Sequence, residues 1–326
     1  MLIEKGLIVD AEEFRTVGKM VPENAHGQRI DAYLGQNFPF HPRSEWKQKL
    51  KVGHAIVNGK SIKPTYKVQF RDRITTWYPE EMEPEVPTDI REIWGAKGIK
   101  AVFKPSGLPM HEVGKFRKNT LSNLLIEKFG PDWSAVHRLD TETSGIVLCG
   151  NEHESRSQLA VDFSNKQIHK EYLAIVLGQP KQNEWTVDAP IGDALDTKLR
   201  KKKSIVPSGE QAITDFRVIK SLSQHSLVKA FPKTGRTHQI RIHAAHSGYR
   251  LLGEKKHIGD ETVFMEFCDR GLTPRVLEAA GCARLCLHSY RIKFFHPILK
   301  EFTTITCPMD AQMQAVWDNL EKAVPS

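Results

Sequence analysis

Apolar residues recur at three- and four-residue spacing in two short stretches near the N-terminus. Ile30 and Leu34 share one face within "GQRIDAYLGQNF", and Trp46 and Leu50 share another within "HPRSEWKQKLKVG". This spacing is typical of amphipathic α-helices, which pack one apolar side against a core. The pattern therefore predicts two short helices, with Ser44 as the N-cap of the second.

A different pattern follows the second predicted helix. In "HAIVNGKSI", two short apolar runs flank Asn58-Gly59, a pair that favours a tight hairpin turn. In "DRITTWY", Ile74, Thr76 and Tyr78 alternate with their neighbours, as expected for a strand. The two helices and the hairpin strands together predict a small α/β module over residues 16–79.

Longer strand-like runs dominate the rest of the chain, which we expect to form a second domain over residues 91–320. "GIVLCG" predicts a buried strand, "HKEYLAIVLG" another, and "QAITDFRVIKSL" with "HSLVKAFPKTGR" a pair of strands. "NEHESRSQLAVDFSNKQ" reads as a helix, and "THQIRIHAAHSG" as a helix from its threonine to Gly248. Because strands and helices do not strictly alternate, the pattern predicts an α+β domain with a mixed, mostly antiparallel sheet.

Charge changes this picture, because it is uneven along the chain. The 326 residues carry a formal net charge of +8, and residues 16–79 contain eleven Lys/Arg against four Asp/Glu. An acidic, proline-bearing stretch follows and predicts a linker over residues 80–90. The basic module favours a polyanion such as RNA as its partner. The alternative is a merely solvated basic face. The residues that we expect to contact RNA are Arg43, Lys47, Lys49 and Lys51.

Several classes of protein are disfavoured by composition. No run approaches the roughly 18 apolar residues of a membrane span, and the N-terminus is a poor secretory signal. Five cysteines with irregular spacing favour reduced thiols in a cytoplasmic protein. The two cysteines and the histidine of "CARLCLH" lack the usual zinc spacing, so we expect no metal site.

Three polar side chains stand at the ends of predicted elements. Asp140 lies in "HRLDTETSG" before a buried strand, Tyr172 lies near the start of the next strand, and Arg236 lies at a strand-to-helix junction. Such places can hold a side chain firmly without covering it. A carboxylate, a phenol and a guanidinium would then converge on one cleft. Alternatively, Asp140 and Arg236 form only a stabilising ion pair, and Tyr172 only packs.

Four ordered motifs carry a resemblance to a known family. "HRLDTETSGIVLCG", "KEYLAIVLG" and "GRTHQIRIHAAHSG" resemble the signatures of the RluA-type pseudouridine synthases, and "VFKPSGLPMH" resembles their upstream motif. The N-terminal segments "RIDAYL" and "RSEWKQKLKVGHAIVNGK" look like the S-four-type RNA-binding module. One departure stands out: where the family continues with Gly-Asp and a nearby Tyr-Gly, this chain has Glu254 and His257-Ile258-Gly259.

The resemblance implies an enzyme that detaches uracil from ribose, turns the ring and rejoins it through carbon. Asp140 would act on the ribose, either as a nucleophile at the anomeric carbon or as a base on the neighbouring sugar proton. Arg236 would keep Asp140 ionised, and Tyr172 would stack on the uracil and help remove a proton. Arg138 would enter the space that the target nucleotide leaves. No cofactor is expected.

The resemblance leaves other questions open. Large-subunit ribosomal RNA is the expected substrate, with transfer RNA as the alternative, and a monomer is expected. A chain of this pattern that is only a non-catalytic RNA-binding or ribosome-assembly protein is a competing interpretation. A carboxylate-dependent glycosidase is a weaker one, because it needs a second acid near Asp140.

Overall fold

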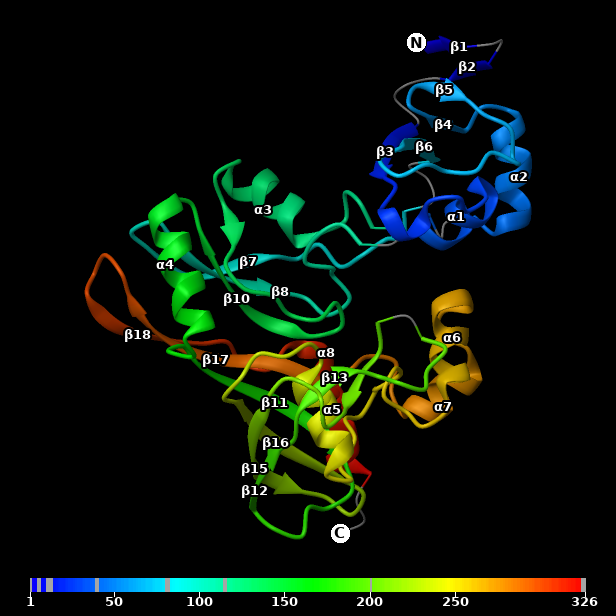
Figure 1. Ribbon diagram of the computed structural model, residues 1–326. Helices are drawn as coiled ribbons and strands as arrows, with labels where there is room; N and C mark the ends of the chain where they lie inside the picture. Colours follow the sequence, from blue (N-terminus) through cyan, green and yellow to red (C-terminus); the bar gives the residue numbers. More distant parts are fainter. Residues whose placement is uncertain are drawn as a thin grey trace. The chain divides into compact units, whose positions relative to one another are not determined.

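The computed structural model describes residues 2–4, 7–9, 14–38, 41–79, 83–113, 116–199 and 201–323. The chain forms two compact units, one of Met1–Glu85 with His111–Thr120 and the other of Val86–Met110 with Leu121–Ser326. None of the described helices combines the length and the hydrophobicity that a membrane-spanning helix needs. Figure 1 shows the elements of both units.

The smaller unit contains the two predicted helices and a four-stranded antiparallel sheet. Its core is formed by side chains such as Leu34, Trp46 and Leu50, each at most 2% exposed, so the apolar faces pack as predicted. Asn58 and Gly59 both have positive φ, as the predicted tight turn requires. The elements are α1 (Ile30–Asn37), α2 (Arg43–Lys51), and a sheet in the order β3 (Phe14–Met20), β6 (Arg73–Pro79), β4 (Ala55–Val57), β5 (Lys60–Ser61).

Two details of this unit differ from the prediction or extend it. Helix α2 begins at Arg43 with Pro42 as its N-cap, so Ser44 is already inside the helix. The unit also contains short elements outside the prediction: β1 (Leu2–Glu4) pairs with β2 (Leu7–Val9), and a 3₁₀ turn, η1, spans Glu23–Ala25 between β3 and α1.

The predicted linker has well-defined contacts where the structure describes it. Residues 80–82 lie outside the described residues. Glu83 accepts hydrogen bonds from three consecutive backbone N–H groups, those of residues 117–119, at 2.6–3.0 Å. Seven residues further on, Ile90 is buried in the core of the larger unit. The boundary between the two units therefore falls inside this stretch.

The larger unit is built on one broad sheet, mixed but mostly antiparallel, as predicted. Among its described strands, only β10 and β17 run parallel. The main strand order is β12 (Glu184–Asp188), β15 (Ile213–Ser221), β16 (His225–Pro232), β11 (His169–Leu177), β17 (Leu287–His296), β10 (Ser144–Gly150), β8 (Ile99–Lys104), β7 (Arg91–Ala96). Strand β18 (Glu301–Thr306) pairs with β17, β9 (Ser134–Ala135) with β10, and β13 (Ile191–Asp193) with β14 (Lys203–Ile205).

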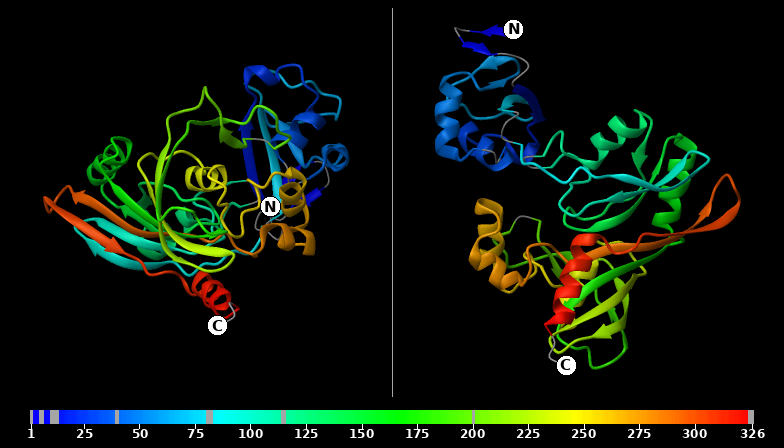
Figure 2. Two further views of the ribbon diagram at one scale, coloured as in Figure 1. Left: turned by 90° about the horizontal axis from the view of Figure 1, so that it is seen from below. Right: turned by 180° about the vertical axis from the view of Figure 1, so that it is seen from behind.

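Helices cover both faces of this sheet. Along β11, Tyr172 and Ala174 pack in the same core as helix α5, whereas Leu173 and Ile175 pack with helix α8. This alternation is expected because successive strand residues point to opposite faces. Accordingly, α5 faces the viewer in Figure 1 and α8 faces the viewer in the right-hand view of Figure 2. The helices are α3 (Leu121–Phe129), α4 (His153–Ser164), α5 (Gln239–His246), α6 (Glu261–Arg270), α7 (Pro274–Ala280) and α8 (Ala311–Lys322).

Two segments near the predicted site differ from the expectations. The helix expected from the threonine of "THQIRIHAAHSG" begins two residues later, at Gln239, because His238 adopts a left-handed conformation with φ 57°. The divergent segment after Glu254 contains α6 and α7. Asp260 and Thr273 cap these helices through hydrogen bonds from backbone N–H groups to their side-chain oxygens.

Candidate active site

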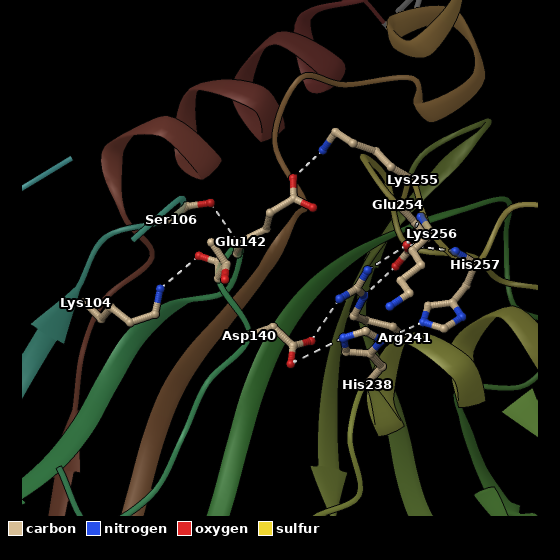
Figure 3. A network of polar contacts seen from close by, with 11 residues as sticks. Lys104, Ser106, Asp140, Glu142, His238, Arg241, Glu254, Lys255, Lys256 and His257 are labelled. Atoms are coloured by element: carbon tan, nitrogen blue, oxygen red, sulfur yellow. Dashed lines mark hydrogen bonds and ion pairs between the residues drawn. The ribbon is translucent and has the colours of Figure 1, made fainter. Parts of the chain in front are cut away.

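Asp140 lies in the loop that enters β10, the strand whose seven residues are all buried. The side chain of Asp140 is 18% exposed, so it is largely covered but still reachable. Two neighbours hold the loop: His137 accepts a hydrogen bond from the backbone N–H of Leu148, and Thr143 donates its N–H to the carbonyl of Asp140. Figure 3 shows the carboxylate of Asp140 directed toward Arg241.

A buried lysine on the neighbouring strand β8 stabilises the loop that carries Asp140. Lys104, at the end of β8, is fully buried and donates three hydrogen bonds to the carbonyl oxygens of Pro105, Leu108 and Thr141, at 2.7–3.0 Å. Burial lowers the pKa of Lys104 to about 7, although Asp140 opposes this shift. Lys104 therefore ties the strand β8 to the loop that carries Asp140.

The partner of Asp140 is Arg241, on the first turn of α5. Its Nη1 donates to Oδ2 of Asp140 at 3.0 Å. Its Nε and Nη2 donate to the two carboxylate oxygens of Glu254, at 2.6 and 2.8 Å. Only 6% of the Arg241 side chain is exposed, so one buried guanidinium joins two carboxylates.

This arrangement sets the charge of Asp140. Burial by itself would raise the pKa of Asp140, but His238 and Arg241 outweigh it and hold that pKa below its ordinary value. Burial likewise would raise the pKa of Glu254, and Arg241 again reverses the effect. Asp140 is therefore an anion at neutral pH, even though it is largely buried.

The prediction that Arg236 pairs with Asp140 is wrong. Arg236 lies in the loop before α5, where it forms an ion pair with Glu210 and donates its Nε to the carbonyl of Gln211 at 3.2 Å. Arg236 and Arg241 are five positions apart, and the left-handed turn at His238 separates them. As a result, Arg236 contacts Glu210 and Gln211 in a neighbouring loop, whereas Arg241, on the helix, contacts Asp140.

One signal in the sequence indicates Arg241. It is a cation that stands between two isoleucines, Ile240 and Ile242, in a predicted helix. A guanidinium in such surroundings is stable only when a buried anion pairs with it. In the sequence, Glu254 is distinguished only as a departure from the family motif.

Tyr172 lies on the same cavity as Asp140. Burial, with Asp140 nearby, raises the pKa of Tyr172, so the phenol is neutral at physiological pH. The cavity has a volume of about 480 Å³, within the usual range for small-molecule sites. Its lining includes Arg138, Asp140, Tyr172, Arg236, His238 and Arg241.

The structure thus brings the four predicted residues Arg138, Asp140, Tyr172 and Arg236 onto one cavity and adds Arg241. No cluster of three or more His, Cys, Asp or Glu side chains suited to a metal ion occurs among the described residues. A fixed carboxylate beside a cavity can attack an electrophilic carbon or accept a proton.

Comparisons with known proteins agree with this chemistry. The family model of RNA pseudouridylate synthases matches residues 100–246. The chain is 31% identical to ribosomal large subunit pseudouridine synthase C of Pasteurella multocida, over 91% of each chain. It is 30% identical to an RNA pseudouridine synthase of Chlorobaculum parvum, over 90% of this chain and 94% of that one. A solved human protein, RNA pseudouridylate synthase domain containing 4, shares the fold at a TM-score of 0.55 and 23% identity, over 71% of this chain and 92% of that one.

The chain belongs to the RNA pseudouridine synthase family, and its fold is the α+β fold of these enzymes. Within that family it is an RluA-type member, as the four motifs predict. It is therefore an enzyme that acts on RNA, and the competing interpretation of a non-catalytic RNA-binding protein is set aside.

Proposed function

We propose that this enzyme converts uridine to pseudouridine in large-subunit ribosomal RNA, with Asp140 acting on the ribose of the target nucleotide. The observation that supports this most is an ionised carboxylate held beside a cavity of nucleotide size. The relatives named ribosomal large subunit pseudouridine synthase, among them the protein of Pasteurella multocida, favour this RNA.

The chemistry requires that Asp140 be ionised when it attacks the ribose. As a nucleophile, it would bond to the anomeric carbon while the uracil leaves; as a base, it would take the neighbouring sugar proton. Arg241 supports both routes, because a guanidinium stays charged and pairs well with a carboxylate. A protonated Asp140 would be unable to do either.

Tyr172 would stack on the uracil and assist the last proton transfer. Since burial keeps Tyr172 neutral, its oxygen can take a proton from the ring carbon only while its own proton moves on. We expect Tyr172→Phe to keep RNA affinity and to lower kcat about 100-fold, the lower end of what one acid–base group contributes. Single-turnover rates and RNA binding, measured on the same preparation, would test this. Equal kcat for the two proteins would exclude the phenol from catalysis.

Arg138 is exposed at the cavity and is well placed for its predicted role. Moving a uridine out of its stack costs a few kcal/mol, and a side chain that fills the space offsets part of that cost. We propose that Arg138 is this side chain. Arg236, which also lines the cavity, would contact RNA and not the reacting atoms.

A second groove adjoins the cavity and suits the rest of an RNA strand. It has a volume of about 1320 Å³ and shares residues such as Lys166, Lys170 and Lys233 with the cavity. Six basic and three acidic side chains line the groove, so it keeps a net positive charge that favours the RNA backbone. The basic side chains are Lys166, Lys170, Arg217, Lys233, Arg291 and Lys293.

The smaller unit would act as the S-four-type RNA-binding module. On its helices, the buried Asp31 is surrounded by Arg29, Arg43 and Lys47, with N–O distances of 3.1–3.9 Å. One carboxylate cannot neutralise three cations, so Arg43 and Lys47, each about half exposed, keep a positive face. Such a face favours the RNA backbone.

Neutralising the lysines of α2 tests this role. We expect the triple change of Lys47, Lys49 and Lys51 to Gln to weaken RNA binding and to reduce the salt dependence of log K. The reduction should be up to about 0.7–0.9 for each phosphate group that the variant no longer neutralises. Lys49 is expected to contribute least, because it is only 22% exposed and lies 3.7 Å from Glu45. Binding titrations at several salt concentrations would measure both effects.

A control variant removes the same charge elsewhere. Lys181, Lys300 and Lys322 are exposed residues of the larger unit. Their combined change to Gln is expected to leave the salt slope nearly unchanged. If both triple variants lose affinity equally, net charge alone would explain binding and the α2 face would have no special role.

Mapping pseudouridines in cellular RNA tests the substrate. Cells that lack this protein, cells that contain it and cells that contain the Asp140→Asn variant would be compared. We expect pseudouridine to be missing from defined sites in large-subunit ribosomal RNA both in cells that lack the protein and in cells with the Asp140→Asn variant. Loss confined to transfer RNA would replace the proposed substrate, and loss of no site would contradict the proposal. We also propose that the enzyme acts as a monomer.

A further inference from the structure

Two histidines lie next to the Asp140–Arg241–Glu254 network. His238 directs its Nε2 toward Oδ1 of Asp140, at 3.9 Å. Its other ring nitrogen, Nδ1, lies 2.9 Å from Nε2 of His257, and the two rings meet edge-on at 5.0 Å. Figure 3 shows this row, in which His257 contacts His238 and His238 faces Asp140.

Both imidazoles are held in place from the backbone. His238 is the N-cap of α5, and its backbone is left-handed, so its side chain leaves the chain in a different direction from those of the helix. The backbone N–H groups of Lys256 and His257 donate to Oε1 of Glu254, at 2.7 and 3.0 Å. Because Glu254 also binds Arg241, the position of His257 is fixed by the same carboxylate that orients the partner of Asp140.

Neither histidine carries a charge at neutral pH. Burial lowers the pKa of His238 to about 4 and that of His257 to about 3, and the nearby Arg241 contributes to both shifts. Asp140 and Glu254 oppose the shift of His238, and Glu254 opposes that of His257, whereas Lys256 adds to both. The contact between the rings is therefore a hydrogen bond between two neutral imidazoles.

A bond between two neutral imidazoles can form in two ways. If His257 donates from Nε2, His238 accepts at Nδ1 and carries its hydrogen on Nε2, facing Asp140. If His238 donates from Nδ1, its Nε2 is a lone pair that faces the carboxylate. A lone pair against an anion is repulsive, whereas an N–H is attractive, so the anion favours the first arrangement.

We propose that His257 is a positioning residue: by donating to Nδ1 of His238, it fixes the tautomer whose Nε2–H faces Asp140. Asp140 then has a donor beside each oxygen, Arg241 at Oδ2 and His238 at Oδ1. The separation of 3.9 Å is long for a hydrogen bond, and such contacts tighten when substrate closes the site. The inference rests on the proposed role of Asp140. It assigns a function to His257, which belongs to the segment where this chain departs from its family motif.

The tautomer of His238 is measurable without any substrate. Nitrogen-15 NMR of the full chain with labelled histidine, at pH 7, distinguishes a protonated from an unprotonated ring nitrogen. The signals of His238 are assigned by their loss in a His238→Gln variant. We expect an unprotonated Nδ1 and a protonated Nε2 in the wild-type enzyme. The opposite pattern would overturn the inference, whatever the RNA substrate proves to be.

Two variants of His257 separate donation from packing. His257→Gln keeps an N–H donor near Nδ1 of His238, and His257→Leu has none. We expect the Leu variant to lower kcat about 10-fold, the size of effect expected from the loss of one hydrogen bond, with KM within about two-fold. The Gln variant should recover most of kcat and the wild-type tautomer.

These measurements test the role of His257 separately from the role of Asp140. Unchanged kcat in the Leu variant, or equal losses in the Gln and Leu variants, would contradict a role for donation by His257. If the Leu variant fails to fold, the wild-type spectrum and the Gln variant still decide the question. If instead Asp140→Asn is fully active while the tautomer is as expected, the proposed role of Asp140 fails and the hydrogen-bond assignment stands.

Discussion

Replacing Asp140 by asparagine is expected to lower kcat by at least about 10³-fold, since one group that serves as nucleophile or base carries much of the rate. Asparagine has nearly the same shape and can still accept from Arg241. The change therefore removes the negative charge and leaves the pair of Arg241 with Glu254 in place. Single-turnover conversion of a target RNA measures the loss, and a melting curve should show a folded protein.

A matched control tests whether the loss of any carboxylate has this effect. Asp132 is an exposed acid eight positions before Asp140, and Asp132→Asn should leave kcat unchanged. If Asp140→Asn converts the RNA as fast as this control, Asp140 has no catalytic role.

The depressed pKa of Asp140 also predicts the acid limit of the reaction. A lowered pKa means that the carboxylate remains charged as the pH falls through 3.8, the ordinary value. Its contribution to stability is likewise present above the unfolded-state pKa and is lost only as the pH falls through the lower, folded-state pKa. Loss of activity from protonation of Asp140 is thus expected below pH 3.8.

Removing Arg241 is expected to have the largest effect on stability. Arg241→Met would leave Asp140 and Glu254 as two buried carboxylates without a counterion, and breaking a buried pair in this way costs about 3–5 kcal/mol. Arg236→Met removes only a partly exposed ion pair, which is worth about 0–1 kcal/mol. Urea unfolding of both variants measures the difference.

A third variant identifies the cause of that loss. Adding Glu254→Gln to Arg241→Met removes one of the two unpaired charges, so the double variant should be more stable than the single one. Its activity should stay low, because Asp140 still lacks its partner. A larger loss for Arg236→Met than for Arg241→Met would contradict the assignment of Arg241 as the partner of Asp140.

The strands, most of the helices and the place of Asp140 could be predicted from the sequence for a physical reason. Apolar periodicity determines which face of an element is buried, and ordered motifs mark the loops between elements. The partner of Asp140 could not be predicted in the same way. Arg236 and Arg241 are close in sequence, and the backbone turn at His238 decides which of them points to the carboxylate. The hydrogen-bonding role of Glu254 likewise depends on a fold that brings its segment beside the loop of Asp140, more than a hundred positions earlier in the chain.

The parallel pairing of β10 with β17 has a consequence for synthesis of the chain. Ser144 lies opposite His288 in that pairing, so β10, which pairs with the earlier strand β8 on its other side, gains its neighbour β17 only after 144 further residues have been made. Arg241 and Glu254 are also translated long before that neighbour. A nascent chain therefore carries every charged member of the network while the middle of its sheet is still open. The enzyme is expected to remain inactive on the translating ribosome until β17 has emerged from the exit tunnel.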